Sequence, residues 1–217
     1  RMIRMAKSLN KVAITATQMM ESMIEAPVPT RAEISDVANA VLDGTDAVML
    51  SAETATGKYP VETVTAMAAA CAEADRADRS HTLDAAFLDR TFTRIDQSIA
   101  MAALFAAHHM RASAIVSLTQ SGSTALWVTR IDSGIPVYAL TPEESSRRRM
   151  TLFRECHPVA MQYRSYDMPA VLADVERLML ENGLVKNGDL VVITVGEPVG
   201  KSGGTNNLKI VRIGSHS

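Results

Sequence analysis

The chain is poor in cysteine, in aromatic residues and in net charge. Its 217 residues include only two cysteines, Cys71 and Cys156, which form no CxxC motif, and aromatic residues make up 4% of the chain. Two cysteines without a metal-binding pattern fit a reducing cytoplasm. The net charge of −2 gives no basic footprint for nucleic acid, so we expect no nucleic-acid partner.

Long apolar segments are also missing. No run approaches the roughly 18 residues that a membrane-spanning helix needs, and no signal peptide is recognisable, so we expect no membrane partner. Apolar residues still make up 47% of the chain, and the 13 methionines among them predict a core that packs adaptably. The sequence begins at Arg1, inside the basic amphipathic stretch RMIRMAKSLN, and we expect a truncated or processed product.

A strand, a helix and a second strand are predicted near the N-terminus. The short apolar runs Val12–Ala16 and Ala47–Leu50 are typical of strands. Between them, Thr30 and Glu33 have the spacing of a capping box, which marks the first turn of a helix. Gly44 fits the left-handed position that follows the end of this helix. These signals together predict a βαβ unit.

Polar side chains follow both strands of this unit: Thr17, Gln18, Ser51 and Glu53. In α/β barrels the chemistry lies at the carboxyl ends of the strands, where a hydroxyl and a carboxylate can act as acids or hydrogen-bond donors and acceptors. Spacing alone favours a simpler interpretation, in which these residues only end strands and cap helices.

The same stretch resembles pyruvate kinases through ATQMMESM, PTRAE, DVANAVLDG and MLSAETATGKYP. The resemblance implies that residues 1–75 are the last two strands of a catalytic (β/α)8 barrel, that 76–94 connect, and that 95–217 form an allosteric α/β domain. It also implies that Thr17 lies beside the substrate, with Gln18 near it. Ser51 and Glu53 would lie near the water network that delivers a proton.

Pyruvate kinases transfer a phosphoryl group from phosphoenolpyruvate to ADP, giving pyruvate and ATP, with the help of Mg²⁺ and K⁺. No segment of this chain resembles the family's phosphate-binding arginine, its catalytic lysine or its metal ligands, which belong to earlier barrel strands. We therefore expect no metal site here and no activity from the isolated chain. The resemblance further implies a cytoplasmic homotetramer.

From residue 95 onward, helical and strand-like segments alternate, which predicts a mostly parallel, doubly wound α/β sheet. The expected strands are 114–119, 137–141, 158–162, 190–195 and 208–213, and the expected helices are 96–110, 123–131, 143–153 and 169–181. The loop before the last strand is too short for a parallel crossover, so this strand should be antiparallel and lie at the edge of the sheet.

Two loops of this second region have the composition of an anion site. The first offers Thr119, Gln120, Ser121, Gly122, Ser123 and Thr124, and the second offers Lys201, Gly203, Gly204 and Thr205. Hydroxyl groups, backbone N–H groups and a lysine can surround a phosphate. A helix cap and a flexible hairpin-like loop are the alternatives. The resemblance to pyruvate kinases implies that both loops bind a sugar-phosphate or AMP effector.

Several points stay open at the level of sequence. The basic run Arg147–Arg149 is either a solvated helix face or a phosphate contact. Trp127 is either a core residue or a border of the effector pocket. For the chain as a whole, the alternatives to an enzyme part are a non-catalytic module for phosphate-ligand binding and oligomerisation, or a structural role in which the strand Leu208–Ile213 pairs subunits.

Overall fold

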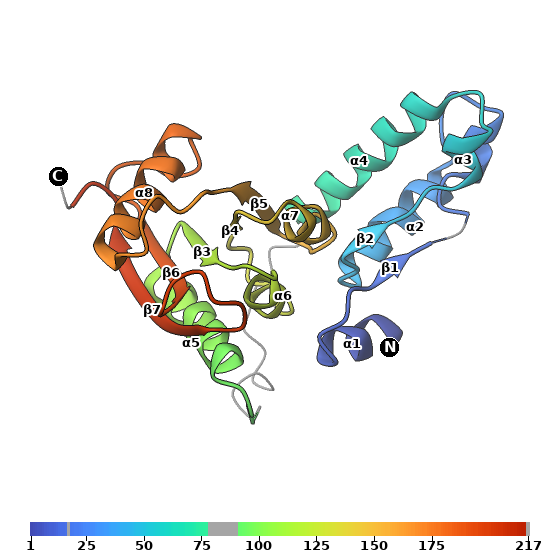
Figure 1. Cartoon of the computed structure of the whole chain (residues 1–217). Coiled ribbons are helices and arrows are strands. Elements are labelled where there is room, and N and C mark those ends of the chain that lie inside the picture. The colour runs from blue at the N-terminus through green and yellow to red at the C-terminus, as the bar shows by residue number, and fades with distance from the viewer. Residues whose placement is uncertain (17, 78–90, 216–217) are drawn as a thin grey trace. The chain divides into compact units, whose positions relative to one another are not determined.

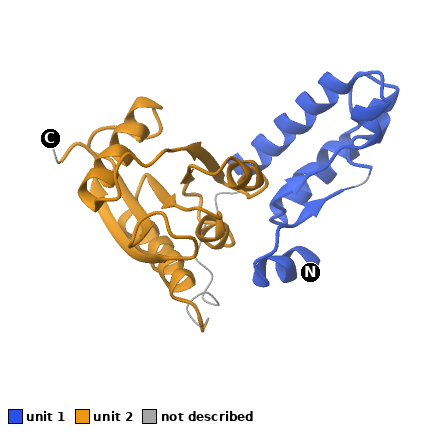
Figure 2. Ribbon diagram, in the orientation of Figure 1, with its two compact units in different colours: residues 1–81 blue, residues 82–217 orange. Residues whose placement is uncertain are grey.

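The computed structural model describes residues 1–16, 18–77 and 91–215. Thr17 and most of the predicted connecting segment 76–94 lie outside these described residues. The chain divides into two compact units, residues 1–81 and residues 82–217 (Figure 2). Among the described residues, none of the helices combines the length and the apolar character that crossing a membrane requires.

The first unit contains α1 (Met2–Ser8), β1 (Ile14–Thr15), the 3₁₀ helix η1 (Glu21–Ile24), α2 (Arg31–Leu42), β2 (Ala47–Val48), α3 (Ala52–Ala55) and α4 (Pro60–Ala77) (Figure 1). β1 and β2 pair in parallel, so the predicted βαβ unit is confirmed. Both strands are shorter than predicted, since each has only the other as a ladder partner among the described residues.

Capping and methionine packing shape this unit as its sequence predicts. Thr30 is the N-cap of α2, and its side chain and that of Glu33 form the complete capping box. Gly44 follows α2 with a φ of 86°, the left-handed conformation that glycine adopts most readily. The buried core between α2, α4 and the loop after β1 is rich in methionine: Met19, Met20, Met23, Val37, Ala40, Met67 and Ala70.

The second unit contains α5 (Ile95–Met110), β3 (Ala114–Leu118), α6 (Ser123–Val128), β4 (Val137–Thr141), α7 (Glu144–Met150), β5 (Cys156–Ala160), α8 (Met168–Glu181), β6 (Leu190–Gly196) and β7 (Thr205–Arg212) (Figure 1). The sheet order is β5-β4-β3-β6-β7, with β7 antiparallel and at the edge. The prediction of a mostly parallel α/β sheet with an antiparallel last strand is therefore confirmed.

The core of this unit forms around the central strands of the sheet. Val171, Val175 and Met179 of α8 pack with the alternate residues Val116 and Leu118 of β3. Because alternate residues of a strand share one face, α8 covers that face of the sheet. α5 contacts β3, β6 and β7. This arrangement fixes the carboxyl ends of β3 and β6, where the two candidate loops begin.

Two predicted strand boundaries are wrong for physical reasons. The strand expected at 158–162 is β5 at Cys156–Ala160, because Pro158 is tolerated inside an edge strand, where its missing N–H costs no ladder bond. The strand expected at 208–213 begins at Thr205, since pairing with β6 recruits the polar residues that precede Leu208. Tertiary pairing outweighs the low strand propensity of two asparagines there.

Two predicted helices also end early. The helix expected to reach Ile131 ends at Val128, and the one expected to reach Phe153 ends at Met150. After each helix end, the chain forms a turn in which a backbone N–H donates to the carbonyl oxygen three residues earlier. After the first helix, Arg130 N–H donates to the Trp127 carbonyl, and after the second, Phe153 N–H donates to the Met150 carbonyl.

Candidate effector pocket and the loops after β1 and β2

The loops after β1 and β2 are joined by a buried carboxylate. Glu53 is only 4% exposed, and its carboxylate accepts hydrogen bonds from Met20 N–H at 3.3 Å and from Ser51 N–H at 2.8 Å. Burial by itself raises the pKa of Glu53, but these backbone donors outweigh it and hold the pKa below its usual value. Glu53 is therefore an ionised anchor between the two loops.

The other residues predicted to act here are placed differently. Thr17 lies outside the described residues. Gln18 and Ser51 are exposed, and Gln18 adopts a left-handed φ of 51°. A catalytic role for Thr17, Ser51 and Glu53, with Gln18 near the substrate, stays a prediction.

Glu33 does more than the capping box predicts. Its carboxylate accepts from Ser22 N–H at 2.7 Å and Ser22 Oγ at 2.6 Å, in addition to Thr30 N–H and Thr30 Oγ1, both at 2.7 Å. Burial alone raises the pKa of Glu33, but the donors from Ser22 and Thr30 lower it to about 2. The capping spacing identifies the Thr30 contacts, whereas the link to Ser22 depends on the tertiary fold.

The two candidate anion loops meet in one pocket of the second unit. Seven predicted residues line it: Thr119, Gln120, Ser123, Thr124, Lys201, Gly203 and Thr205. Ser121, Gly122 and Gly204 belong to the same loops but are not among the described lining residues. The cavity volume is about 10 Å³, close to the space that one water molecule needs.

Hydroxyl groups hold the two loops together. Thr124 Oγ1 and Thr205 Oγ1 form a buried hydrogen bond of 2.8 Å between residues 81 positions apart in the chain. Thr119 Oγ1 accepts from Gly122 N–H at 2.9 Å, and Ser121 Oγ lies 3.1 Å from Ser123 Oγ. The pocket is thus lined by hydroxyls that can each donate or accept.

Sequence patterns missed one wall of the pocket, which comes from the segment after β5. Tyr163 lines the pocket, and its ring centroid lies 6.1 Å from that of Tyr166. Tyr166 packs closely on Gly200, because a Cβ added there would lie 2.9 Å from the Tyr166 ring. Burial, and then the neighbouring Tyr166, raises the pKa of Tyr163, so its neutral hydroxyl can donate. No motif in the sequence links residue 163 to the two loops.

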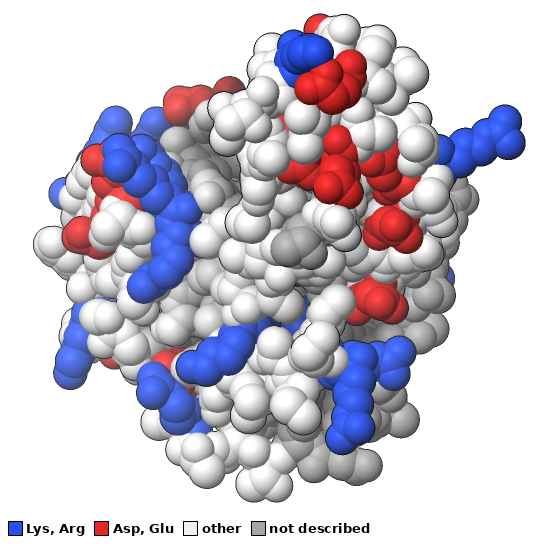
Figure 3. All heavy atoms as spheres, turned by 90° about the vertical axis from the view of Figure 1, so that its right-hand side faces the viewer, with Lys and Arg blue, Asp and Glu red and all other residues white. Residues whose placement is uncertain are grey.

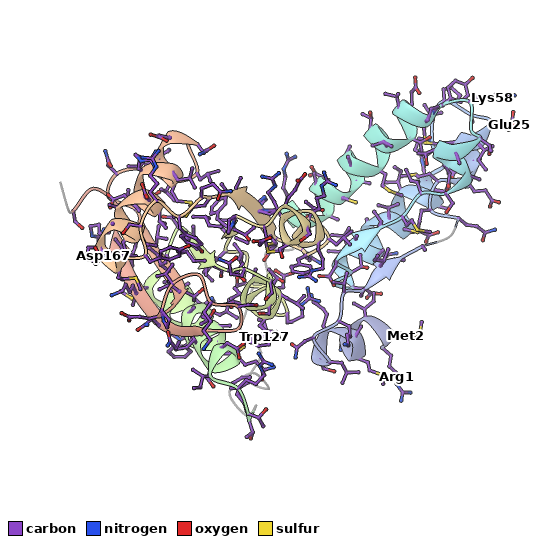
Figure 4. The ribbon with its side chains drawn as sticks, in the orientation of Figure 1. Arg1, Met2, Glu25, Lys58, Trp127 and Asp167 are labelled. Atoms are coloured by element: carbon purple, nitrogen blue, oxygen red, sulfur yellow. The ribbon has the colours of Figure 1, made fainter. Side chains whose placement is uncertain are left out.

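The surroundings of Trp127 bear on the role that the sequence left open for it. Trp127, labelled in Figure 4, is 8% exposed and is not among the described residues that line the pocket. Its ring centre lies 5.1 Å from the guanidinium carbon of Arg94. Its burial away from the pocket favours a core role. On the face shown in Figure 3, acidic side chains gather mainly at the upper right, and most lysine and arginine side chains lie at the left and along the bottom. No group of three or more His, Cys, Asp or Glu suited to a metal occurs among the described residues.

Two pyruvate kinase family models match the chain, the barrel domain over residues 1–64 and the alpha/beta domain over residues 97–211. The chain is 47% identical to a pyruvate kinase of Buchnera aphidicola subsp. Schizaphis graminum and 45% identical to pyruvate kinase II of Salmonella typhimurium, in each case over 98% of this chain and 44% of the relative.

A crystal structure of a pyruvate kinase from Cryptosporidium parvum has a TM-score of 0.88 at 33% identity and covers 98% of this chain and 42% of the other. The chain therefore spans less than half the length of the curated relatives that it matches. Because the alpha/beta-domain model alone covers more than half of the 217 residues, the chain belongs to the pyruvate kinase family.

Proposed function

We propose that this chain is the C-terminal part of a pyruvate kinase, the glycolytic enzyme that transfers a phosphoryl group from phosphoenolpyruvate to ADP. Residues 1–75 would belong to its catalytic barrel, residues 76–94 would connect, and residues 95–217 would form its allosteric domain. The barrel and alpha/beta family models match on the two sides of residues 65–96, and the two compact units divide at 81/82; both support this division. The complete protein would act in the cytoplasm as a homotetramer.

The chemistry of the barrel would need groups that the described residues do not bring together. Glu33 and Glu53 are the buried carboxylates of the first unit, and both already accept hydrogen bonds from the protein. These hydrogen bonds leave the two carboxylates unsuited to hold a Mg²⁺ or K⁺ ion. The chain alone would be inactive, and what its residues would do is shape the loops that present Thr17, Gln18 and Ser51.

The second unit would carry a binding site for a phosphorylated effector, either a sugar phosphate or AMP. The observation that carries this proposal is the convergence of Thr119, Ser123, Thr124 and Lys201 on one pocket from loops far apart in the chain. Lys201 would supply the positive charge and the hydroxyls would donate to phosphate oxygens, since charge-assisted hydrogen bonds are the stronger kind. Tyr163 would form the wall against the sugar.

The small volume of the pocket also supports a regulatory role. With a volume of about 10 Å³, it would admit a phosphate ester only when the loop bearing Lys201 moves outward. A ligand that binds the open arrangement better would shift the population toward it. In the complete enzyme, that shift would be the signal passed to the barrel.

Titration calorimetry of the 217-residue chain with ribose 5-phosphate, AMP and fructose 1,6-bisphosphate tests the effector site. We expect at least one of them to bind, and Lys201→Gln to weaken binding about tenfold, as losing a hydrogen bond to a charged group does. Lys186→Gln is the matched control, because Lys186 is exposed and outside the pocket lining. Equal affinities in both variants, or no binding by the unmodified chain, would contradict the effector site.

A non-catalytic phosphate-binding module is the second candidate, and the separate pocket of the second unit favours it. Binding in this calorimetry, without turnover of phosphoenolpyruvate and ADP by the same chain, is common to both candidates. They differ once the chain is combined with a barrel segment from a relative: recovered turnover supports the enzyme, and its continued absence supports the module.

A further inference from the structure

One arginine of the basic run on α7 contacts the first anion loop. The guanidinium Nη2 of Arg149 donates a hydrogen bond to the backbone carbonyl oxygen of Ser121, 28 residues earlier in the chain. Its neighbour Met150 is fully buried and packs against Gly122. Two consecutive residues of α7 therefore contact two consecutive residues of the loop.

These contacts fix the peptide group between Ser121 and Gly122. Its carbonyl oxygen accepts from Arg149, while its N–H donates to Thr119 Oγ1 at 2.9 Å. Because a peptide group is planar, holding both its oxygen and its N–H sets the orientation of the whole group. Ser123 and Thr124, which line the pocket, follow immediately and take their direction from it.

Packing on Met150 removes the freedom that the loop would otherwise have. Gly122 has a φ of 79°, and a Cβ built there would lie 2.8 Å from both Cγ and Sδ of Met150. The loop thus cannot move toward α7, and the guanidinium of Arg149 keeps it from moving away. A charged donor on a carbonyl is among the stronger hydrogen bonds in proteins.

The neighbouring arginine does none of this. Arg148 pairs with Glu144 on the exposed surface of the same helix, one turn earlier. The run of three arginines therefore combines a surface ion pair with a contact that shapes the pocket. This difference provides a control within one helix turn.

We propose that Arg149 is a positioning residue, which holds the 119–124 loop in the arrangement that binds a phosphoryl group. This inference rests on the proposed effector site. Arg149 acts through the Ser121 carbonyl rather than by touching the ligand, so its removal weakens binding by letting Ser123 and Thr124 lose their shared orientation. A lysine at the same position keeps one charged donor and restores part of the effect.

The experiment measures binding of ribose 5-phosphate and of inorganic phosphate to the 217-residue chain by calorimetry. The variants are Arg149→Gln, Arg149→Lys and the control Arg148→Gln. We expect Arg149→Gln to weaken binding about tenfold, Arg149→Lys to give an intermediate affinity, and Arg148→Gln to bind like the unmodified chain. The melting temperatures of all variants should stay together, since each change is on the surface.

The outcomes separate this inference from the proposal on which it rests. If the unmodified chain binds but Arg149→Gln and Arg148→Gln are indistinguishable, the positioning role is wrong and the effector site stands. If Arg149→Gln loses affinity together with thermal stability, and Arg149→Lys rescues neither, the role of Arg149 is structural only. If the unmodified chain binds neither ligand, the effector site itself is refuted, and the role of Arg149 with it.

Discussion

The two units differ in how completely they bury their own apolar surface. The second unit contains a five-stranded sheet, and its central strand β3 is buried at every position. The first unit has a two-stranded sheet with two residues in each strand, and Ile14 of β1 is 49% exposed. A two-stranded sheet is marginal without further packing. What holds the first unit together is therefore its methionine core and two buried carboxylates, rather than a sheet.

Separate unfolding of the two units is the largest expected effect. We expect circular dichroism to show two thermal transitions, with the first unit unfolding at the lower temperature. The chain has a single tryptophan, Trp127, which is buried in the second unit. Its fluorescence should therefore report only the upper transition. Coincident transitions by both probes would show that the two units unfold as one and would contradict a less stable first unit.

Glu33→Gln should lower the midpoint of the first transition strongly. An amide cannot accept at both positions, so some donors of Ser22 and Thr30 lose their partner. Glu25→Gln is the matched control, since the Glu25 carboxylate forms an exposed ion pair with Lys58, and Figure 4 labels both residues. Exposed pairs of this kind contribute little, and the control should leave the midpoint unchanged. If both variants shift the midpoint equally, Glu33 does not stabilise the first unit through its hydrogen bonds to Ser22 and Thr30.

The same carboxylate gives the first unit a distinct pH dependence. The pKa of Glu33 is about 2, against 4.5 for the ordinary group, so the ionised form stabilises the fold. Its contribution is complete above about pH 4.5 and is lost as the pH falls toward 2; from the shift it amounts to on the order of 3 kcal/mol. In Glu33→Gln the lower transition should lose this part of its acid sensitivity. An unchanged pH profile in the variant would contradict it.

Gly122→Ala should destabilise the second unit by a smaller amount. The new methyl group combines a left-handed backbone with a contact of 2.8 Å to Met150, and strain of this kind costs about 1–3 kcal/mol. Gly183→Ala separates the two causes, because Gly183 has a φ of 64° and nothing within 4 Å of an added Cβ. The fluorescence transition should fall further in the first variant. Equal falls would assign the whole effect to backbone strain.

Local patterns predicted much of this fold. The capping box at Thr30, the left-handed Gly44 and the antiparallel last strand each rest on chemistry within a few residues. The strand boundaries at Pro158 and Thr205 were wrong, because they depend on whether a neighbouring strand is present. That information lies in the tertiary fold and not in the segment itself.

The candidate site likewise has parts that the local sequence predicts and parts that depend on the tertiary fold. Composition pointed to both anion loops, since hydroxyls, glycines and a lysine are recognisable in sequence. Tyr163 could not be found, because it is part of no motif and reaches the site from another element. The run Arg147–Arg149 stood out as basic, but its sequence gave no sign that Arg149 contacts the backbone of Ser121. Likewise, the capping pattern at Glu33 gave no sign of its bonds to Ser22.

A titration of the ¹⁵N-labelled chain with ribose 5-phosphate, followed by amide chemical shifts, tests the central contrast most directly. The second unit has the pocket proposed to bind a phosphate ester, whereas the loops of the first unit are held by buried carboxylates. We therefore expect the largest changes at residues 119–124 and 199–205, with Tyr163 also shifted and residues 18–60 unmoved. Changes centred on residues 18–60, or none anywhere at saturating ligand, would contradict the assignment of the effector site.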